Sequence, residues 1–406
     1  MKKIELVNKA VELGFEDIGF ASVELFESQR DILNSRKDEY SWLISKGTDI
    51  FSGVDPKNFM SDAATIVVLI DVYFKESFPT KLEGYFGRTY LDDDRITKGH
   101  LYQRIKNFRG FLRDNGIESK IPFNMPHRLS AARAGLGTFG KNNFFYSNKV
   151  ARKSSWITPI PIVVNYEFTP DKPTIEVGCP KWCKNTCIIS CPTGALRKPN
   201  TVDPRKCISY LSYYQEGITP MELREPMGLY VYGCDRCQNV CPRNQAWLAK
   251  DLAPNQRVKA KMDDFELTKL LHMSKQYYKS NIWPHMFYMS YNDLWRWKMN
   301  VARAMGNTHD RKYIPELIKA FEESNDKRVQ GMIAWALGNL GGEKSKEALK
   351  LFLSSSEGLV KDEITSALDK FNSLKKIGPE EDIHCQYCGI KLTKGEEITH
   401  SCKKKP

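Results

Sequence analysis

Eight of the eleven cysteines lie in the middle of the chain, between residues 179 and 241. They form two runs that each end in Cys-Pro, with one further cysteine between the runs. In proteins that hold two 4Fe-4S clusters, the cysteine before the proline binds the cluster that the other run mainly builds. The pattern therefore predicts two sets of four ligands: Cys179, Cys183, Cys187 and Cys241 for one cluster, and Cys207, Cys234, Cys237 and Cys191 for the other.

Zinc sites and disulfides are the alternative uses of so many cysteines. Zinc ligands usually come as two short knuckles rather than as a run of four that ends in Cys-Pro. Disulfides are rare in the cytosol, and the first residues, MKKIELVNKA, show no secretory signal. The first run departs from the common bacterial spacing in one respect, because its first two gaps hold three residues each instead of two.

The length of 406 residues is enough for two or three domains with cores of their own. The most apolar stretch, AATIVVLIDVYF from Ala63, is too short to cross a bilayer. Because the start of the chain also lacks an export signal, we expect a cytoplasmic protein. The net charge of +12 favours either simple solubility or a polyanionic partner such as RNA, and the charge alone does not choose between them.

The pattern of residues 1–168 predicts an α/β domain. Ile4, Val7, Ala10, Val11 and Leu13 are spaced to form one face of a helix that ends at Gly14. Strands are expected from IGFASV, from the stretch after Ala63 and from WITPIPIVVNYEF, and a further helix is expected to end at Gly116.

A glycine-rich loop, Gly135-Leu-Gly-Thr-Phe-Gly-Lys141, formally matches a dinucleotide-binding fingerprint. We reject that interpretation, because a helical stretch precedes the glycines where a strand is required and residues 141–166 before Glu167 hold no carboxylate for a ribose. Two readings stay open: a backbone that approaches something flat and bulky, or a tight connection between a helix and a strand.

The sequence pattern predicts helices over residues 251–375. After an aromatic stretch, Ala304-Met-Gly-Asn307 recurs thirty-two residues later as Ala336-Leu-Gly-Asn339, which predicts HEAT-like repeats. The tail from 380 to 406 is a separate unit in which Cys385, Cys388, His400 and Cys402 could bind zinc, or in which the thiols are spare.

The order of these segments resembles the cobalamin-dependent epoxyqueuosine reductases and their relatives, the reductive dehalogenases. The resemblance implies a nitroreductase-like corrinoid domain over 1–168, a two-cluster ferredoxin-like domain over 169–250 and helical repeats over 251–375. The motifs that carry it are GYFGRTY (84–90), ARAGLGTFGKN (132–142), both cysteine runs, RKCISYL (205–211), YVYGCDRCQNVCPRN (230–244) and WKMNVARAMGN (297–307).

Such a protein would pass electrons from its clusters to a base-off corrinoid, which removes the oxygen of an epoxide in a tRNA nucleoside, and a ferredoxin or flavodoxin would supply the electrons. The chain has no D-x-H-x-x-G run for a His-ligated corrinoid. By resemblance, Ser209 lies between a cluster and the corrinoid ring. The residues expected to face the corrinoid are Gly87, Arg88, Tyr90, Gly135, Gly137, Gly140, Lys141 and Asn142.

One departure from the family concerns its proton donor, an aspartate in a D-x-x-P motif. Asn124 stands near that place, and an amide cannot donate a dissociable proton as a carboxylic acid does. His127 and Tyr90 are the candidates for a replacement, although His127 also reads as an ordinary helix-start residue. The alternatives are a reductase of another substrate, an electron carrier or reductive activator of a separate corrinoid protein, and an RNA-binding module with structural clusters.

Overall fold

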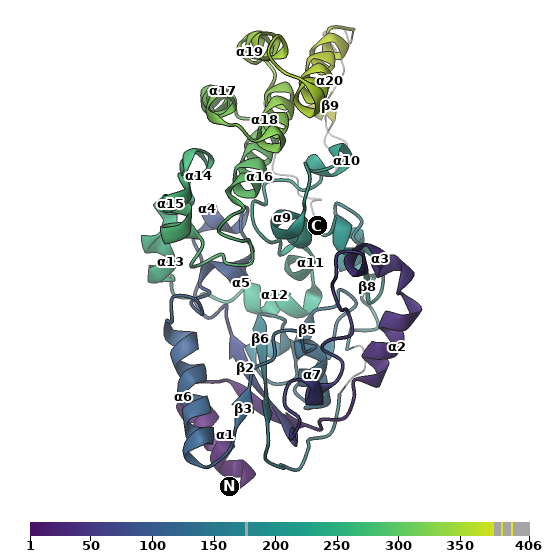
Figure 1. Cartoon of the computed structure of the whole chain (residues 1–406), viewed down its shortest axis with the longest axis vertical. Coiled ribbons are helices and arrows are strands. Elements are labelled where there is room, and N and C mark those ends of the chain that lie inside the picture. The colour runs from purple at the N-terminus through teal and green to yellow at the C-terminus, as the bar shows by residue number, and fades with distance from the viewer. Residues whose placement is uncertain (175–177, 377–382, 385–390, 393–406) are drawn as a thin grey trace. The chain divides into compact units, whose positions relative to one another are not determined.

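A computed structural model describes residues 1–174, 178–376, 383–384 and 391–392 of the chain. The chain divides into two compact units, residues 1–304 and residues 305–406 (Figure 1). Residues 251–304, which the sequence groups with the repeats, belong to the first unit. Within the described ranges, no helix is long and apolar enough to cross a membrane. The four predicted zinc ligands, Cys385, Cys388, His400 and Cys402, lie outside the described residues.

A four-stranded antiparallel sheet forms the centre of the first unit. Its strand order is β1 (Asp17–Ala21), β2 (Thr65–Val72), β6 (Ile157–Val164) and β3 (Ser119–Lys120). Every residue of β2 is buried, as its run of β-branched residues predicts. Proline is tolerated in β6 because β3 pairs only with Val163 and Val164, so one side of β6 is free of ladder bonds at Pro159 and Pro161.

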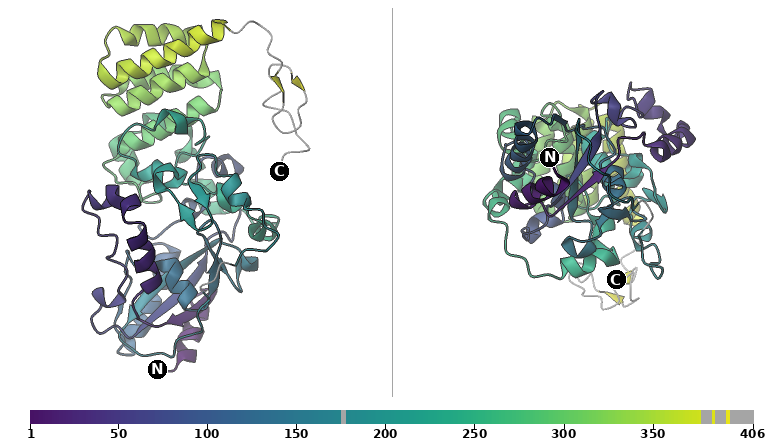
Figure 2. Two further views of the ribbon diagram at one scale, coloured as in Figure 1. Left: turned by 90° about the vertical axis from the view of Figure 1, so that its right-hand side faces the viewer. Right: turned by 90° about the horizontal axis from the view of Figure 1, so that it is seen from below.

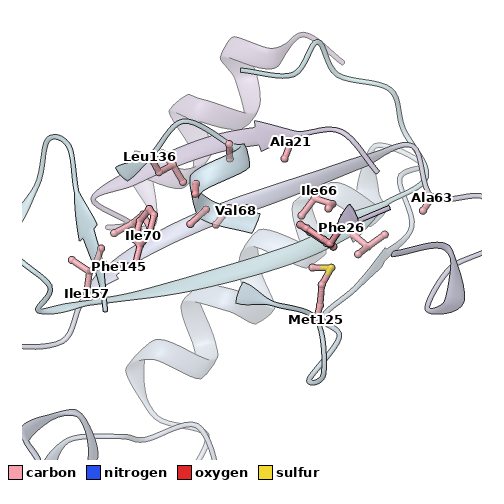
Figure 3. Packing of buried hydrophobic residues seen from close by; sticks show 14 of the residues in the cluster. Ala21, Phe26, Ala63, Ile66, Val68, Ile70, Met125, Leu136, Phe145 and Ile157 are labelled. Carbon is pink, nitrogen blue, oxygen red and sulfur yellow. The ribbon is translucent and has the colours of Figure 1, made fainter. Parts of the chain in front are cut away.

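Helices cover both faces of this sheet (Figures 1 and 2). Helices α1 (Lys3–Glu12) and α6 (His100–Asp114) pack on the face that carries Val67 and Leu69 of β2. Helix α7 (His127–Arg133) packs on the other face, where Ile66, Val68 and Ile70 meet Met125, Leu136 and Phe145 (Figure 3). Alternate residues of β2 therefore supply two separate cores, and the α/β prediction for this part is confirmed as a mixed fold of helices and sheet.

The buried face of α1 overlaps the predicted one, since Val7, Ala10 and Leu13 pack on the core as predicted, but Leu6 is buried in place of Ile4 and Val11. Leu6 and Ala10 are completely buried, whereas Ile4 is 58% exposed and Val11 is 63% exposed. Helical spacing admits either face, and the face with Leu6 meets the apolar side chains of Phe15, Phe20 and Phe108.

Short elements fill the rest of the first unit and hold the cysteine region against the sheet. Their bounds are α2 (Glu27–Ser35), α3 (Ser41–Ile44), α4 (Thr80–Glu83), α5 (Arg88–Leu91), β4 (Gly137–Phe139), β5 (Phe145–Ser147), α8 (Thr186–Ile189), β7 (Leu196–Lys198), β8 (Thr201–Val202), α9 (Ile208–Tyr214), α10 (Met221–Arg224), α11 (Arg236–Asn239), α12 (Pro242–Leu248), α13 (Gln256–Ala260), α14 (Leu267–His272) and α15 (Lys275–Tyr277). Helix α16 (Leu294–Asn307) runs across the division at residue 304.

The second unit consists of stacked helices, α17 (Ile314–Glu323), α18 (Lys327–Leu340), α19 (Glu343–Leu353) and α20 (Gly358–Lys376) (Figure 2). The repeated Ala-x-Gly-Asn motif has a direct packing role there. A Cβ atom on Gly306 would lie 2.9 Å from the Cα of Ala336, and one on Gly338 would lie 2.8 Å from the Cβ of Ala367. The side chain of Asn339 donates to the carbonyl of Gly306 at 3.0 Å, so the repeat records the points where successive helices touch.

Candidate functional site

A cavity of about 1,100 Å³ lies in the first unit, beside the sheet. This is at the upper end of the range for small-molecule pockets, so it has room for a large cofactor. Its wall includes four cysteines, and they are the four that the sequence assigns to one cluster: Cys191, Cys207, Cys234 and Cys237. None of the other four predicted ligands lines this cavity.

The remaining thiols form a group of their own. Burial and then the neighbouring thiols of Cys241, Cys179 and Cys183 together raise the pKa of the Cys187 thiol to about 11. The same partnership is seen from Cys241, whose pKa is raised by burial and by Cys179. The last cysteine of the second run thus lies with the first three of the first run.

The cavity thiols show the complementary grouping. Burial raises the pKa of Cys234, and Cys207 and Cys191 raise it further. Burial, and then the thiols of Cys234 and Cys207, raise the pKa of Cys237 well above its ordinary value. Cys191, the last cysteine of the first run, therefore lies with the second run, which is the crossed arrangement that the two Cys-Pro endings predict.

Hydrogen bonds to sulfur surround both groups. The backbone N–H of Lys141 lies 3.3 Å from Sγ of Cys179, and the N–H of Arg236 lies 3.4 Å from Sγ of Cys234. Donors of this kind stabilise thiolates and the anionic clusters that thiolates bind, so the donor chemistry fits iron–sulfur ligation. No three Cys, His, Asp or Glu side chains of the described ranges are arranged to hold a single metal ion.

A buried ion pair connects the GRTY segment to the second cysteine run. The side chain of Asp235, between Cys234 and Cys237, accepts a bond of 2.7 Å from the backbone N–H of Arg88. The guanidinium of Arg88 contacts the same carboxylate at 3.4 Å and also binds Glu83 and Asn239. Burial raises the pKa of Asp235 despite the neighbouring cation. Arg88 thus lines the cavity, but its charge is used to hold the loop between two cysteines.

Tyrosines form the adjacent part of the wall. The hydroxyl groups of Tyr90 and Tyr213 lie 3.1 Å apart, and the rings of Tyr232 and Tyr288 pack on Tyr90 at 5.0 and 5.5 Å. Burial raises the pKa of Tyr90 well above its ordinary value, so the phenol stays protonated. Ser209 also lines the cavity, as does Cys207 two residues before it.

The glycine-rich loop has a different role from the one the resemblance implies. A Cβ atom on Gly137 would lie 2.1 Å from the carbonyl oxygen of Tyr146, and one on Gly135 would lie 2.6 Å from that of Lys172. One on Gly140 would meet the ring of Tyr146 at 2.4 Å. The glycines therefore allow close packing against protein backbone and an aromatic ring, and none of the three lines the cavity.

The end of this loop joins the cavity to the first group of thiols. Asn142 is buried, lines the cavity and donates to the carbonyl of Cys237 at 3.2 Å. Lys141 points elsewhere, because its ammonium group binds the Asn185 side chain at 2.8 Å, within the first cysteine run. Gly87 is also packed against protein, since a Cβ there would lie 3.0 Å from the Tyr90 ring.

Of the three predicted catalytic residues, His127 and Tyr90 line the cavity and Asn124 does not. Nε2 of His127 lies 3.1 Å from the carbonyl of Pro122, and burial lowers the pKa of His127, so the ring is neutral near pH 7. Asn124 is exposed, and its amide lies 3.4 Å from the hydroxyl of Ser52, away from the cavity wall.

Sequence reasoning missed Asp235, Tyr146 and Tyr213. A carboxylate inside a C-x2-C pair was a usable signal for Asp235, because a charged residue there must be paired if it is buried. Tyr146, whose hydroxyl donates to Sγ of Cys241 at 3.1 Å, carries no signal in the sequence. Tyr213 lies one helical turn after Ser209 and could have been found from the helical spacing.

Comparisons with known proteins agree with this architecture. The 4Fe-4S double cluster binding domain matches residues 179–244, and HEAT repeats match residues 292–369. Epoxyqueuosine reductase of Bacillus anthracis is 28% identical over 368 residues, which cover 86% of this chain and 91% of that protein.

Solved structures give the same result. A crystal structure of epoxyqueuosine reductase with an epoxyqueuosine-modified tRNA-Tyr stem loop superposes with a TM-score of 0.75 at 27% identity, covering 91% of this chain and 98% of that one. A structure of the Bacillus subtilis enzyme, with its catalytic aspartate loop swung out of the active site, gives a TM-score of 0.74 at 27% identity with the same coverage. With its double-cluster cysteines and its repeats, the chain is an oxidoreductase that is similar to the epoxyqueuosine reductases over most of its length.

Proposed function

We propose that this protein reduces epoxyqueuosine to queuosine in tRNA. The observation that carries the proposal is the position of the thiols: one group of four lines a cavity large enough for a cofactor, and the other group lies outside it. Two redox centres arranged in this way would lead electrons from outside the cavity into it. The similarity to a reductase solved with an epoxyqueuosine-modified stem loop supports the choice of substrate.

The chemistry needs two electrons and two protons. Removing the epoxide oxygen breaks both of its C–O bonds, leaves a carbon–carbon double bond and releases the oxygen as water. A corrinoid bound in the cavity would supply a metal centre of sufficiently low potential for this reduction, with Asn142, Ser209 and the tyrosine wall as its contacts. The size and the partly polar wall of the cavity fit such a group.

The proton must come from another residue than the family's aspartate. His127 and Tyr90 both line the cavity and carry exchangeable protons. Tyr90 remains protonated over the whole physiological range, and His127 becomes a donor only when the pH falls towards its lowered pKa. Asn124 does not line the cavity, and its amide lies 3.4 Å from the Ser52 hydroxyl.

The rim of the cavity suits a nucleic acid. Phe123 is 79% exposed and lines the opening, where an aromatic ring can stack on a base. Arg128 is exposed nearby, and within the described part of the chain it contacts a carbonyl and the Phe144 ring rather than a carboxylate. A guanidinium without a carboxylate partner is available to a phosphate.

The test is to purify the protein without oxygen, quantify iron and cobalt together, and incubate the reduced protein with tRNA that contains epoxyqueuosine. We expect about eight irons for two four-iron clusters, one bound corrinoid, and conversion of the nucleoside to queuosine by mass spectrometry. A protein that binds the corrinoid but leaves epoxyqueuosine unchanged would contradict this substrate and indicate a reductase of another substrate. A protein that binds no corrinoid would contradict the proposed reaction and favour an electron carrier.

A further inference from the structure

The first cysteine run carries two of the most exposed large apolar side chains in the described part of the protein. Trp182 is 68% exposed and Ile189 is 77% exposed. Trp182 directly precedes Cys183, and Ile189 follows Cys187 by two residues, so both lie close to thiols of the group outside the cavity. The two side chains lie in one short segment, and together they offer apolar area to a protein partner.

The charged side chains of the segment from 178 to 202 are all cationic. From Gly178 to Val202 the chain contains Lys181, Lys184, Arg197 and Lys198 and not one aspartate or glutamate. Lys181 and Lys184 are exposed, and neither forms an ion pair with a carboxylate in the ranges that the structure describes. Arg197, in contrast, is paired with Glu39 at 2.5 Å. The segment that holds Cys179, Cys183 and Cys187 is therefore cationic and also carries two exposed apolar side chains.

The segment has a defined conformation. Asn185 adopts a left-handed backbone conformation, with φ of 61°, and its side chain accepts a bond of 2.8 Å from the ammonium group of Lys141. The N–H of Cys183 donates to the carbonyl of Pro180 at 3.0 Å, which closes a turn around Trp182. A surface that is already ordered costs little entropy when a partner binds.

Electrons that arrive from another protein must reach the thiols outside the cavity first. The other four thiols line the cavity, where substrate and cofactor would exclude a protein partner. Cys179 and Cys183 are partly exposed, so a redox group docked over this segment would be only a short distance from the cluster that they bind.

We propose that Lys181, Trp182, Lys184 and Ile189 form the docking surface for an acidic protein that carries a one-electron redox group. Each encounter oxidises the partner by one electron and reduces the nearer cluster by one, and two encounters supply the electrons for one turnover. Lysines steer an acidic surface into contact, and the two apolar side chains give the short-lived complex its contact area. The inference rests on the proposed cluster ligation, and it does not depend on which substrate is reduced.

The test uses the anaerobic holoprotein and purified bacterial flavodoxin hydroquinone as the probe. Stopped-flow bleaching of the cluster absorbance gives the second-order rate of reduction, and dithionite, a small reductant, gives a rate that needs no docking. For Lys181→Glu/Lys184→Glu we expect the rate of reduction by flavodoxin to fall about tenfold or more at low salt. This difference from the unmutated protein should disappear at high salt, and the rate with dithionite should not change. Trp182→Ser and Ile189→Ser should lower the flavodoxin rate at every salt concentration.

The matched controls are Val11→Ser on α1 and Lys106→Glu on α6, which alter an exposed apolar residue and a surface lysine away from the cysteines. If the apolar variants fail to retain their iron, the lysine variants carry the test alone. Unchanged flavodoxin rates in the lysine variants would overturn the proposal. Loss of binding to a tRNA stem loop in those variants, with flavodoxin reduction intact, would also overturn it and assign the surface to RNA.

Discussion

The hydroxyl of Tyr146 lies 3.1 Å from the sulfur of Cys241, and both side chains are buried. Hydrogen bonds to ligand sulfur raise the reduction potential of an iron–sulfur cluster, because they stabilise the extra negative charge of the reduced state. We therefore expect Tyr146→Phe to make the potential of one cluster more negative and to leave the other unchanged. A redox titration followed by electron paramagnetic resonance measures this, with Tyr166→Phe as the control because that hydroxyl bonds to Met1 and, among the described residues, to no cysteine.

The crossed grouping of the thiols predicts which cluster each substitution removes. Cys241→Ser should damage the same cluster as Cys179→Ser, although Cys241 belongs to the second run. Cys191→Ser should damage the same cluster as Cys234→Ser. The spectrum of the surviving cluster should match within each pair and differ between pairs. If Cys241→Ser instead matched Cys234→Ser, each run would build its own cluster.

The buried pair of Arg88 and Asp235 predicts a large effect on stability. Removing Asp235 leaves the buried backbone N–H of Arg88 without its acceptor, which costs about 1–3 kcal/mol, while the guanidinium keeps Glu83 as its partner. Asp235→Ala should therefore lower the urea midpoint of unfolding strongly and weaken the cluster at Cys234 and Cys237. Asp114→Ala is the control, since that carboxylate is 71% exposed and only contacts an exposed arginine, and its effect should stay within about 0.5 kcal/mol.

The pH dependence of the reaction distinguishes the two candidate proton donors. Burial lowers the pKa of His127, so its protonated fraction, and a rate that depends on it, rises as the pH falls from neutral towards that pKa. Burial raises the pKa of Tyr90, so a rate that depends on it stays flat over the same interval. Single-turnover rates of the reduced protein give the profile. His127→Gln should abolish a rise that is due to His127, and Tyr90→Phe should leave that rise in place.

Much of this fold could be predicted because its signals are local. The run of β-branched residues in β2 predicts a buried strand, and the recurring Ala-x-Gly-Asn motif records where repeat helices touch. The endings of the cysteine runs predict a crossed grouping of the thiols, and the four cysteines that line the cavity are one of the two predicted sets.

Features that depend on contacts between distant segments could not be predicted. The buried face of α1 is chosen by Phe20 and Phe108, which lie on other elements. From the sequence, the glycines of the 135–140 loop are equally consistent with a cofactor site and with close packing. Only the positions of the Tyr146 and Lys172 backbones, which lie against them, decide for packing. The hydrogen bond between Arg88 and Asp235 joins positions 147 residues apart, and the sequence around either residue does not indicate its partner.

The exchange of the last cysteine between the two runs has a consequence for synthesis. Cys241 completes the group begun at Cys179, so that group cannot close until the ribosome has added more than sixty further residues. The other group also waits for the second run, because Cys234 and Cys237 belong to it. The last ligands of both groups are therefore synthesised within a few residues of each other. A chain released from the ribosome before Cys241 would lack the fourth cysteine of the group that begins at Cys179.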